Sequence, residues 1–191
     1  MKKLNMTTKY IRIVGGTYRR TPITVIDAPG LRPTPDRVRE TLFNWLRHFW
    51  HGDFAGKRVL DLFAGSGALG FEAASRGAAH VQMIESDKRA VQAMQALRDK
   101  LGAQAVQVRS GDALAALRAA RGYDLVFLDP PFGQGWPARI WPLLPAALAP
   151  GALVYIEAET ALEAPSGFEL LRQDKAGAVH YHLLQFAALQ D

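Results

Sequence analysis

The chain has no cysteine among its 191 residues. This absence excludes disulfide bonds, Cys-ligated zinc, iron–sulfur clusters and a cysteine nucleophile. Long apolar runs are also missing, since none approaches the roughly 20 residues that cross a bilayer, and the opening MKKLNMTTKY has no apolar signal core. The five histidines show no spacing typical of a metal site. We therefore expect a cytoplasmic protein with no metal and no membrane association.

Acidic residues are scarce in the first fifty positions, which carry 10 basic and 3 acidic side chains and a net charge of +7. The other 141 residues carry a net charge of −2. A basic segment attached to a nearly neutral body indicates a polyanionic partner, and it favours nucleic acid over a membrane surface. A solvated basic arm is the alternative interpretation.

From residue 58 onward, short apolar runs alternate with helical patterns. The runs occupy residues 58–63, 80–85, 105–110, 123–129 and 152–159. Such alternation predicts an α/β fold with a mostly parallel sheet and helices on both faces. Ser86 or Asp87 is the expected N-cap of the helix after the second run. After residue 160, two strand-like runs joined by the turn-like DKAG predict an antiparallel hairpin that completes the sheet.

The first fifty residues follow another pattern. YIRIVGGTYRRTPITVID predicts two short strands around Gly15 and Gly16. TPDRVRETLFNWLRHFW predicts a helix with Thr34 as its N-cap and Pro35 at its first position. Helical spacing of the apolar residues predicts one face packed on the domain, which leaves the arginines available to solvent or a partner. These apolar residues are Val38, Leu42, Trp45, Leu46 and Phe49, and these arginines are Arg37, Arg39 and Arg47.

A glycine-rich stretch, VLDLFAGSGALG at 59–70, follows the first apolar run and opens a helix. Gly65, Gly67 and Gly70 fit G-x-G-x-x-G, and Glu85 ends the second run, so the stretch matches the dinucleotide-binding fingerprint. The glycines let the backbone approach a ligand, and the acid accepts hydrogen bonds from ribose hydroxyls. Every adenosine-containing cofactor makes these demands, so an NAD-dependent oxidoreductase is only one interpretation.

Three further features distinguish the possible cofactors. Asp61 lies inside the first run, where its carboxylate can meet an ammonium group. Asp112 ends the third run, where it can accept a hydrogen bond from an adenine amino group. DPPF, residues 129–132, ends the fourth run at the edge where open α/β sheets bind ligands. An ammonium, a ribose and an adenine together describe S-adenosylmethionine, although Asp61 can also cap a turn and Asp112 can cap the next helix.

The motifs DLFAGSGALG, IESD, GDA and LDPPF resemble those of class I S-adenosylmethionine-dependent amino-methyltransferases. RIVGGTYRR and LRPTPDRVRETLFNWL are similar to the RsmD-type family, and the resemblance extends from about Arg12 to the last strand. It implies a Rossmann-like fold with a seven-stranded sheet, a basic RNA-binding extension (1–50) and a methyltransferase domain (51–191). It also implies a cytoplasmic monomer that methylates the N2 of a guanine in 16S ribosomal RNA, at guanine 966, within the small ribosomal subunit or its assembly intermediate.

The resemblance and the motif positions together give the predicted site. The cofactor-binding residues are Asp61, Phe63, Ala64, Gly65, Ser66, Gly67, Glu85, Ser86, Asp112 and Ala113. The arginines that clamp RNA phosphates are Arg12, Arg19, Arg20, Arg32, Arg37 and Arg39. The catalytic residues are Asp129, Pro130, Pro131 and Phe132. S-adenosylmethionine is the expected cofactor, S-adenosylhomocysteine is its product, and no metal is expected.

The DPPF tetrapeptide suits methyl transfer to an amino nitrogen. The lone pair of guanine N2 is delocalised, and a carboxylate and a carbonyl that both accept its hydrogens favour a pyramidal nitrogen. Asp129 and the Pro130 carbonyl suit these roles, and Pro131 stiffens the loop. Phe132 offers a face for stacking a flipped base, worth roughly 1–3 kcal/mol. Whether Asp129 or water finally takes the proton stays open. The same residues also end a strand in a turn, which is compatible with the catalytic role.

Four alternative functions remain. Two keep the cofactor and change the acceptor, giving a DNA adenine or a protein glutamine amino-methyltransferase. The third is the oxidoreductase that the glycine fingerprint allows. The fourth is an RNA-binding assembly factor without catalytic activity, which the basic arm fits equally well.

Overall fold

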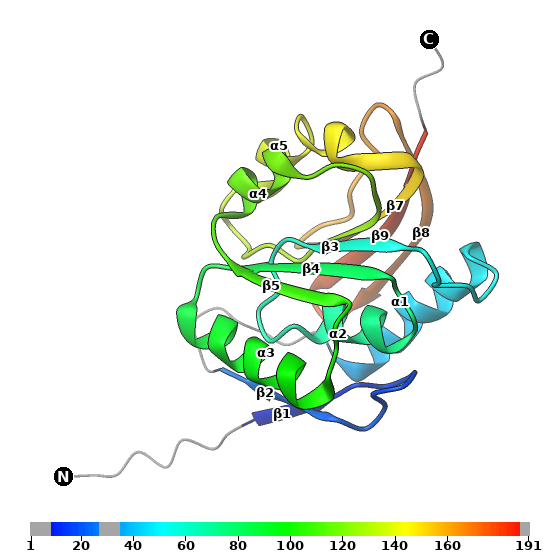
Figure 1. The fold of residues 1–191 in the computed structure, drawn as a ribbon. Helices are drawn as coiled ribbons and strands as arrows, with labels where there is room; N and C mark the ends of the chain where they lie inside the picture. Colours follow the sequence, from blue (N-terminus) through cyan, green and yellow to red (C-terminus); the bar gives the residue numbers. More distant parts are fainter. Residues whose placement is uncertain (1–8, 27–34, 188–191) are drawn as a thin grey trace.

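The computed structural model describes residues 9–26 and 35–187. Within these residues a two-stranded sheet pairs β1 (Lys9–Arg12) with β2 (Pro22–Val25), and seven strands form a larger sheet (Figure 1). The strands of the larger sheet are β3 (Arg58–Asp61), β4 (His80–Glu85), β5 (Val106–Ser110), β6 (Tyr123–Leu128), β7 (Leu148–Ala158), β8 (Phe168–Ala176) and β9 (Val179–Phe186). The helices are α1 (Asp36–Phe49), α2 (Ala68–Ser75), α3 (Lys88–Leu101), α4 (Ala113–Ala119), α5 (Trp136–Ile140) and the 3₁₀ turn Leu144–Ala147.

The strand order of the larger sheet is β5-β4-β3-β6-β7-β9-β8. The first five of these strands are parallel, and β9 is antiparallel to both of its neighbours. The chain moves outward from β3 to β5 and then returns to β6 on the other side of β3. The carboxyl ends of β3 and β6 therefore lie side by side, at the switch point where open α/β sheets bind ligands. The predicted mostly parallel sheet and its C-terminal hairpin are confirmed.

Helices cover both faces of the larger sheet, as predicted (Figure 1). Successive strand residues point to opposite faces, so Val59 and Leu125 pack with α1, α2 and α3, while Leu60 and Val126 pack with α4 and α5. The described helices include none that is long and apolar enough to cross a membrane. The two packed faces hold the carboxyl ends of the parallel strands in a fixed arrangement.

The small N-terminal sheet is fixed on α2, the helix that the glycine-rich stretch opens. The carboxylate of Glu72 is fully buried and accepts hydrogen bonds from the backbone nitrogens of Val14 (2.7 Å) and Gly15 (2.9 Å). The Ser75 hydroxyl accepts another from the backbone nitrogen of Tyr18, at 2.8 Å. The segment between β1 and β2 is therefore anchored to the same layer that carries the glycine-rich loop.

Helix α1 packs against the sheet through the predicted apolar face, where Val38, Leu42 and Leu46 are buried. Its start differs from the prediction. Thr34 lies outside the described residues, and Pro35 precedes the helix with an extended backbone (φ −56°, ψ 148°) instead of forming its first turn. Proline has no N–H group to donate, so Pro35 costs the helix no hydrogen bond either just before α1 or at its first position.

The exposure predicted for the arginines of α1 is partly wrong. Arg37 and Arg47 are exposed, but the Arg39 side chain is fully buried and pairs with Asp36. Arg39 lies one turn before the buried Phe43, so it falls on the packed side of the helix. Its Nε and Nη1 atoms have no hydrogen-bond partner. A side chain enclosed in this way cannot contact RNA phosphates, so Arg39 is removed from the predicted RNA-binding set.

Several element boundaries differ from the predicted ones. Strand β7 begins at Leu148 instead of residue 152, and the C-terminal hairpin turns at Gly177 and Ala178 because most of DKAG extends β8. Of the two residues expected to cap α3, Asp87 does so: its side chain accepts from the backbone nitrogens of Arg89 and Ala90.

Candidate active site

The glycine-rich loop joins β3 to α2 at the carboxyl edge of the sheet. Gly65 (φ 54°) and Gly67 (φ 82°) both adopt left-handed backbone conformations, which side chains other than glycine rarely tolerate. A Cβ atom on Gly67 would also lie 2.9 Å from the Met94 sulfur. Ala64 donates its backbone N–H to the Ile84 carbonyl at 2.9 Å, which ties the loop to β4. The two glycines therefore fix a tight turn, and Gly67 packs closely against Met94.

Asp61, the last residue of β3, is a buried carboxylate with a perturbed pKa. Asp61 is only 2% exposed, and this burial raises its pKa to about 7. Backbone hydrogen bonds from Gly70 and Phe63 lower the pKa, but they do not offset the effect of burial. The charge of Glu85 raises it further. One carboxylate oxygen, Oδ2, has no hydrogen-bond partner. A cationic group beside this oxygen would satisfy it and would favour the ionised form.

Glu85 ends β4 and holds the glycine-rich loop. Its Oε2 atom accepts from the backbone nitrogen of Gly65 at 2.8 Å. Its Oε1 atom accepts from the backbone nitrogens of Ser86 (2.7 Å) and Asp87 (2.8 Å). The Ser86 hydroxyl also donates to Oε1, at 3.3 Å, so Oε2, which accepts only from Gly65, is the oxygen with capacity left for a ribose hydroxyl. The structure thus places the predicted ribose-binding acid against the predicted loop.

Asp112 and Ala113 follow β5 on the same edge. The Asp112 side chain caps α4 by accepting from the backbone nitrogen of Ala115 at 2.8 Å, which is the alternative role that the sequence left open. The residue is exposed, and capping occupies only one of its oxygens, Oδ1. Capping and a hydrogen bond to an adenine amino group are therefore compatible.

The DPPF residues follow β6, directly beside the end of β3. Asp129 is half-buried, Pro130 is buried, and Phe132 is 42% exposed; among the described residues it is one of two exposed large apolar side chains. Strands β3 and β6 pair through Asp61 and Phe127, so the glycine loop and the tetrapeptide leave neighbouring strands. The structure therefore brings the two motifs together although about 60 residues separate them in the chain.

The loop after the tetrapeptide closes over a small pocket of about 190 Å³. Pro130, Phe132 and Trp136 line it on one side, and the end of β7 lines it on the other. The ring of Trp136 lies edge-on to Phe63, with centroids 4.9 Å apart, which joins this loop to the glycine-rich loop. The backbone nitrogen of Gly133 donates to Glu159 at 3.2 Å. Contacts from two other segments thus hold the tetrapeptide loop in place.

Sequence reasoning missed the acidic end of β7. Glu157 is 6% exposed, lines the small pocket and accepts a hydrogen bond from the Tyr155 hydroxyl at 2.8 Å. Burial raises the pKa of Tyr155 well above its usual value, and the charges of Glu157 and Asp129 raise it further. The only sequence signal was the pair of acids in YIEAE at the end of an apolar run.

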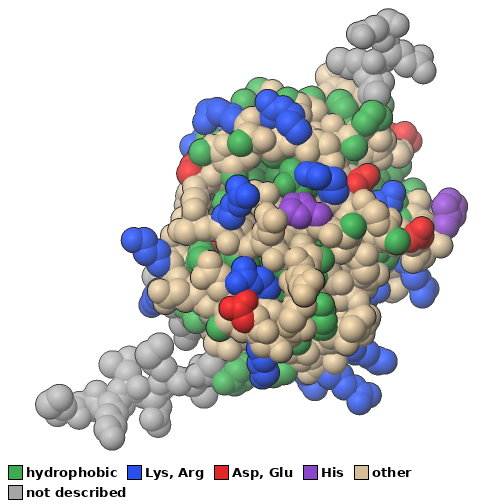
Figure 2. Space-filling view, viewed as in Figure 1, with side chains coloured by type: hydrophobic (Ala, Val, Ile, Leu, Met, Phe, Trp, Pro, Cys, Tyr) green, Lys and Arg blue, Asp and Glu red, His purple; other side chains and the backbone are tan. Residues whose placement is uncertain are grey.

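The predicted RNA-binding arginines have different surroundings. Arg12, Arg19, Arg20 and Arg37 are exposed, whereas Arg32 lies outside the described residues. On the face that Figure 2 shows, Lys and Arg side chains are scattered among apolar and neutral surface instead of forming one continuous patch. These four exposed arginines are therefore accessible to a polyanion.

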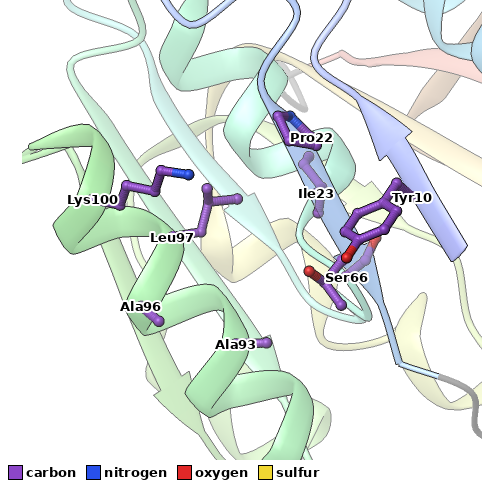
Figure 3. A pocket seen from close by; sticks show the side chains of 9 residues that line it. Tyr10, Pro22, Ile23, Ser66, Ala93, Ala96, Leu97 and Lys100 are labelled. Atoms are coloured by element: carbon purple, nitrogen blue, oxygen red, sulfur yellow. The ribbon is translucent and has the colours of Figure 1, made fainter. Parts of the chain in front are cut away.

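A groove separates the N-terminal hairpin from α3 (Figure 3). Tyr10 and Ile23 line its hairpin side, Leu97 and Lys100 line its helix side, and Ser66 of the glycine-rich loop also contributes to the wall. Its volume is about 580 Å³, and Tyr10 is 62% exposed. The groove therefore connects the basic N-terminal segment with the loop predicted to bind the cofactor.

His182, in the C-terminal hairpin, has a structural role. His182 is buried, and its Nε2 atom accepts from the backbone nitrogen of Leu162 at 3.1 Å. Burial lowers its pKa. A search of the described residues finds no group of three or more His, Asp or Glu side chains that could hold a metal ion.

Comparison with known proteins identifies close relatives. The family model described as Conserved hypothetical protein 95 matches residues 11–185. "Ribosomal RNA small subunit methyltransferase D" of Escherichia coli (strain K12) is 42% identical over 193 residues, which cover 97% of this chain and 95% of that protein.

Two solved structures share the fold. "Putative methyltransferase yhhF from Escherichia coli" is 41% identical, with a TM-score of 0.83 over 94% of this chain and 99% of that one. "SMU.776, a putative methyltransferase complexed with SAH" is 17% identical, with a TM-score of 0.67 over 86% of this chain and 53% of that one. The class I methyltransferase fold is therefore shared with proteins well beyond the close relatives.

Proposed function

The chain belongs to the Conserved hypothetical protein 95 family, the RsmD family of methyltransferases, and from this membership we propose that it methylates small-subunit ribosomal RNA with S-adenosylmethionine as the methyl donor. The proposed acceptor is the exocyclic N2 of a guanine, and family resemblance assigns it to guanine 966 of 16S RNA. The proposed substrate is the assembled small subunit or its assembly intermediate, met in the cytoplasm by a monomeric enzyme.

The residues at the carboxyl edge fit S-adenosylmethionine. Asp61 has a buried, unpartnered oxygen that suits the ammonium group, and Glu85 lies beside the loop where it can accept from the ribose. Asp112 lies at the end of β5, where it can accept from the adenine amino group. The loop residues Phe63, Ala64, Gly65, Ser66 and Gly67, with Ser86 and Ala113, complete the proposed cofactor site. When bound, the cofactor supplies an electrophilic methyl group on a sulfonium.

The tetrapeptide is proposed to prepare the acceptor nitrogen. The Asp129 carboxylate and the Pro130 carbonyl accept the two amino hydrogens, which localises the lone pair of N2 and directs it at the methyl carbon. As the N–C bond forms, the S–C bond breaks, S-adenosylhomocysteine leaves, and the nitrogen loses a proton to Asp129 or to water. Pro131 keeps the loop rigid, and the exposed Phe132 ring stacks on the extruded base.

The N-terminal fifty residues are proposed to bind the RNA around the target, and residues 51–191 to form the methyltransferase domain. Arg12, Arg19, Arg20 and Arg37 are exposed and suit phosphate contacts. The groove between the hairpin and α3 suits a single-stranded segment, since Tyr10 offers a stacking face and Lys100 offers a charge. The groove includes Ser66, so RNA bound there would lie beside the cofactor loop.

The observation that supports this function best is the placement of two motifs on paired strands. The glycine-rich loop leaves β3, the tetrapeptide leaves β6, and Asp61 at the end of β3 is a buried acid suited to a cation. Nicotinamide cofactors carry a pyrophosphate at such a loop, and a buried carboxylate there would repel it. The geometry therefore favours a methyltransferase over an oxidoreductase.

A transfer assay tests the proposal. Small subunits that lack the modification, free 16S RNA, duplex DNA and a protein extract are each incubated with S-adenosylmethionine carrying a labelled methyl group. Label is expected in small-subunit RNA, and the Asp129→Ala variant is expected to lose transfer while it still binds S-adenosylhomocysteine in calorimetry. Label only in DNA or protein, or calorimetric binding of NAD without S-adenosylhomocysteine, would refute the proposal. Undiminished transfer by Asp129→Ala would refute the assigned chemistry.

A further inference from the structure

A second groove lies on the face of the larger sheet opposite the N-terminal hairpin. The hairpin packs on the face that α2 and α3 cover, where Ile13 and Ile23 join the core. On the other face, a groove of about 460 Å³ lies between α4 and the strands β4 and β5, and we name it the α4 groove. Ile84 lines it and belongs to the same core as Leu117 of α4, which identifies the face. The other residues that define the α4 groove include Arg58, Gln82, Arg109, Asp112, Arg121 and Tyr123.

The lining of the α4 groove is positively charged. Its ionisable residues are three exposed arginines, Arg58, Arg109 and Arg121, and one exposed acid, Asp112, which gives a net charge of +2. His80 is paired with Arg58 across β4 and β3. Burial lowers the pKa of His80, and the charges of Arg58 and Arg109 lower it further. The three arginines lie far apart in the chain, so only the fold brings their charges to one groove.

Neutral groups hold two of these arginines in place. The Arg58 guanidinium lies over the ring of Tyr123, 5.1 Å from its centroid, and the Tyr123 hydroxyl donates to the Gln82 side chain at 2.8 Å. The Nη1 atom of Arg121 donates to two backbone carbonyls at the end of α4, at 2.7 Å and 2.6 Å. Among the described residues, no acid forms an ion pair with any of the three arginines. Their charges therefore stay available to a bound anion, and two of them are already positioned for it.

The α4 groove reaches the edge of the sheet where the proposed cofactor site lies. It extends from Arg58 at the start of β3 to Asp112, just after the end of β5. Strand β5 is the edge strand of the sheet, and the N-terminal hairpin, α3, β5 and α4 follow one another along one side of the molecule (Figure 1). A large RNA particle that contacts the hairpin can therefore reach the α4 groove around this edge.

We propose that the α4 groove is a second RNA-binding surface, in which Arg58, Arg109 and Arg121 hold backbone phosphates of the small-subunit RNA. This inference rests on the proposed function. Guanidinium groups bind phosphate oxygens through paired hydrogen bonds, and such contacts position an RNA without reading its sequence. The groove lies outside the first fifty residues, to which the sequence assigned RNA binding. Residues 51–191 carry a net charge of −2, so their average charge does not reveal a local basic surface.

The salt dependence of binding tests this assignment. Affinities for protein-free 16S RNA and for small subunits that lack the modification are measured at several salt concentrations. The proteins are the wild type, the double variant Arg58→Gln/Arg109→Gln and the matched control Arg172→Gln/Lys175→Gln. The control removes two positive charges from β8, at the opposite edge of the sheet. Calorimetry with S-adenosylhomocysteine confirms that each variant is folded, and Arg109→Gln alone replaces the double variant if that variant does not fold.

In the double variant, the slope of log affinity against log salt is expected to fall by about 1–2 with both RNA substrates, and by about 1 in Arg109→Gln alone. The control is expected to keep the wild-type slope, and all variants the wild-type affinity for S-adenosylhomocysteine. An unchanged slope, or an equal fall in the control, overturns the inference alone. A fall with particles but not with protein-free RNA would assign the groove to a protein of the particle and also overturn it. Absence of wild-type methylation of small subunits overturns the proposed function, whatever the slopes are.

Discussion

Replacing Asp61 with asparagine separates the effect of this buried acid on folding stability from its effect on cofactor binding. The pKa of Asp61 is about 7 in the folded protein and 3.8 in a model peptide. Because the folded-state pKa is the higher one, the ionised carboxylate destabilises the fold. That destabilisation is absent below pH 3.8, grows between pH 3.8 and about 7, and is constant above.

The magnitude follows from the size of this shift. One pKa unit corresponds to 1.36 kcal/mol, so the ionised Asp61 costs roughly 4 kcal/mol at pH 8. Asp61→Asn removes the charge and keeps the shape, and is expected to raise the free energy of unfolding by about 1–4 kcal/mol at pH 8, since the amide also has some desolvation cost. For a chain of this size, each kcal/mol shifts the melting temperature by about 2–4 °C.

Urea unfolding at pH 8, 6 and 4 measures this change, with Asp99→Asn on the surface of α3 as the control. The stability gained by Asp61→Asn should shrink between pH 8 and 4 and vanish near pH 4, whereas the control should show no such trend. A variant that is less stable than the wild type by an equal amount at all three pH values would refute the reasoning. Asp61 would then stabilise the fold through its hydrogen bonds.

The same substitution should weaken cofactor binding. An ammonium group interacts with the ionised carboxylate, so wild-type affinity for S-adenosylhomocysteine should fall by up to about tenfold per pH unit below pH 7 and level off above it. Asp61→Asn should bind about 10- to 100-fold more weakly at pH 8 and lose this pH dependence. A variant that is more stable and yet binds more weakly would identify Asp61 as an acid retained for its ligand.

Three further predictions concern the RNA side and its support. Phe132→Ala should weaken binding of the small subunit by roughly 1–3 kcal/mol while calorimetry shows unchanged affinity for S-adenosylhomocysteine; equal loss of both would indicate general damage. Glu72→Gln should lower the free energy of unfolding by about 1–3 kcal/mol in urea and speed proteolysis between β1 and β2, because this buried acid holds Val14 and Gly15; unchanged values would contradict the anchoring role. Replacing Arg12, Arg19 and Arg20 with alanine should reduce the slope of log affinity for RNA against log salt by about 2–3, and an unchanged slope would show that they do not contact phosphates.

The fold was predictable because local patterns carried it. The alternation of apolar runs with helical segments predicted the parallel order, and the pair of runs after residue 160 predicted the hairpin. Asp87 capped α3 because a short acidic side chain suits that position. Boundaries were less predictable: Pro150 and Gly151 suggested a loop before residue 152, yet β7 begins at Leu148. Pairing with β6 at Tyr123 overrode those local preferences.

The sequence located the motifs at the edge of the sheet where the structure has them, but it missed features that depend on packing. Position in the sequence identified Asp61, Glu85 and Asp129, but only the structure shows that Asp61 is buried with an unpartnered oxygen. Arg39 was assigned to solvent by helical position, whereas the packing of α1 encloses it. Glu157 was missed because its position beside the tetrapeptide depends on the pairing between β6 and β7. The burial of Asp61 and Arg39 and the position of Glu157 all depend on tertiary contacts, which a single sequence does not show.

Mapping the modified nucleotide in 16S RNA shows directly whether this protein methylates guanine 966. 16S RNA is isolated from cells that lack this protein, from cells in which it is restored, and from cells restored with Asp129→Ala. One N2-methylguanine, at guanine 966, is expected to be lost on deletion, to return with the wild-type protein and not to return with the variant. A 16S RNA whose N2-methylguanines are the same in all three would contradict this expectation.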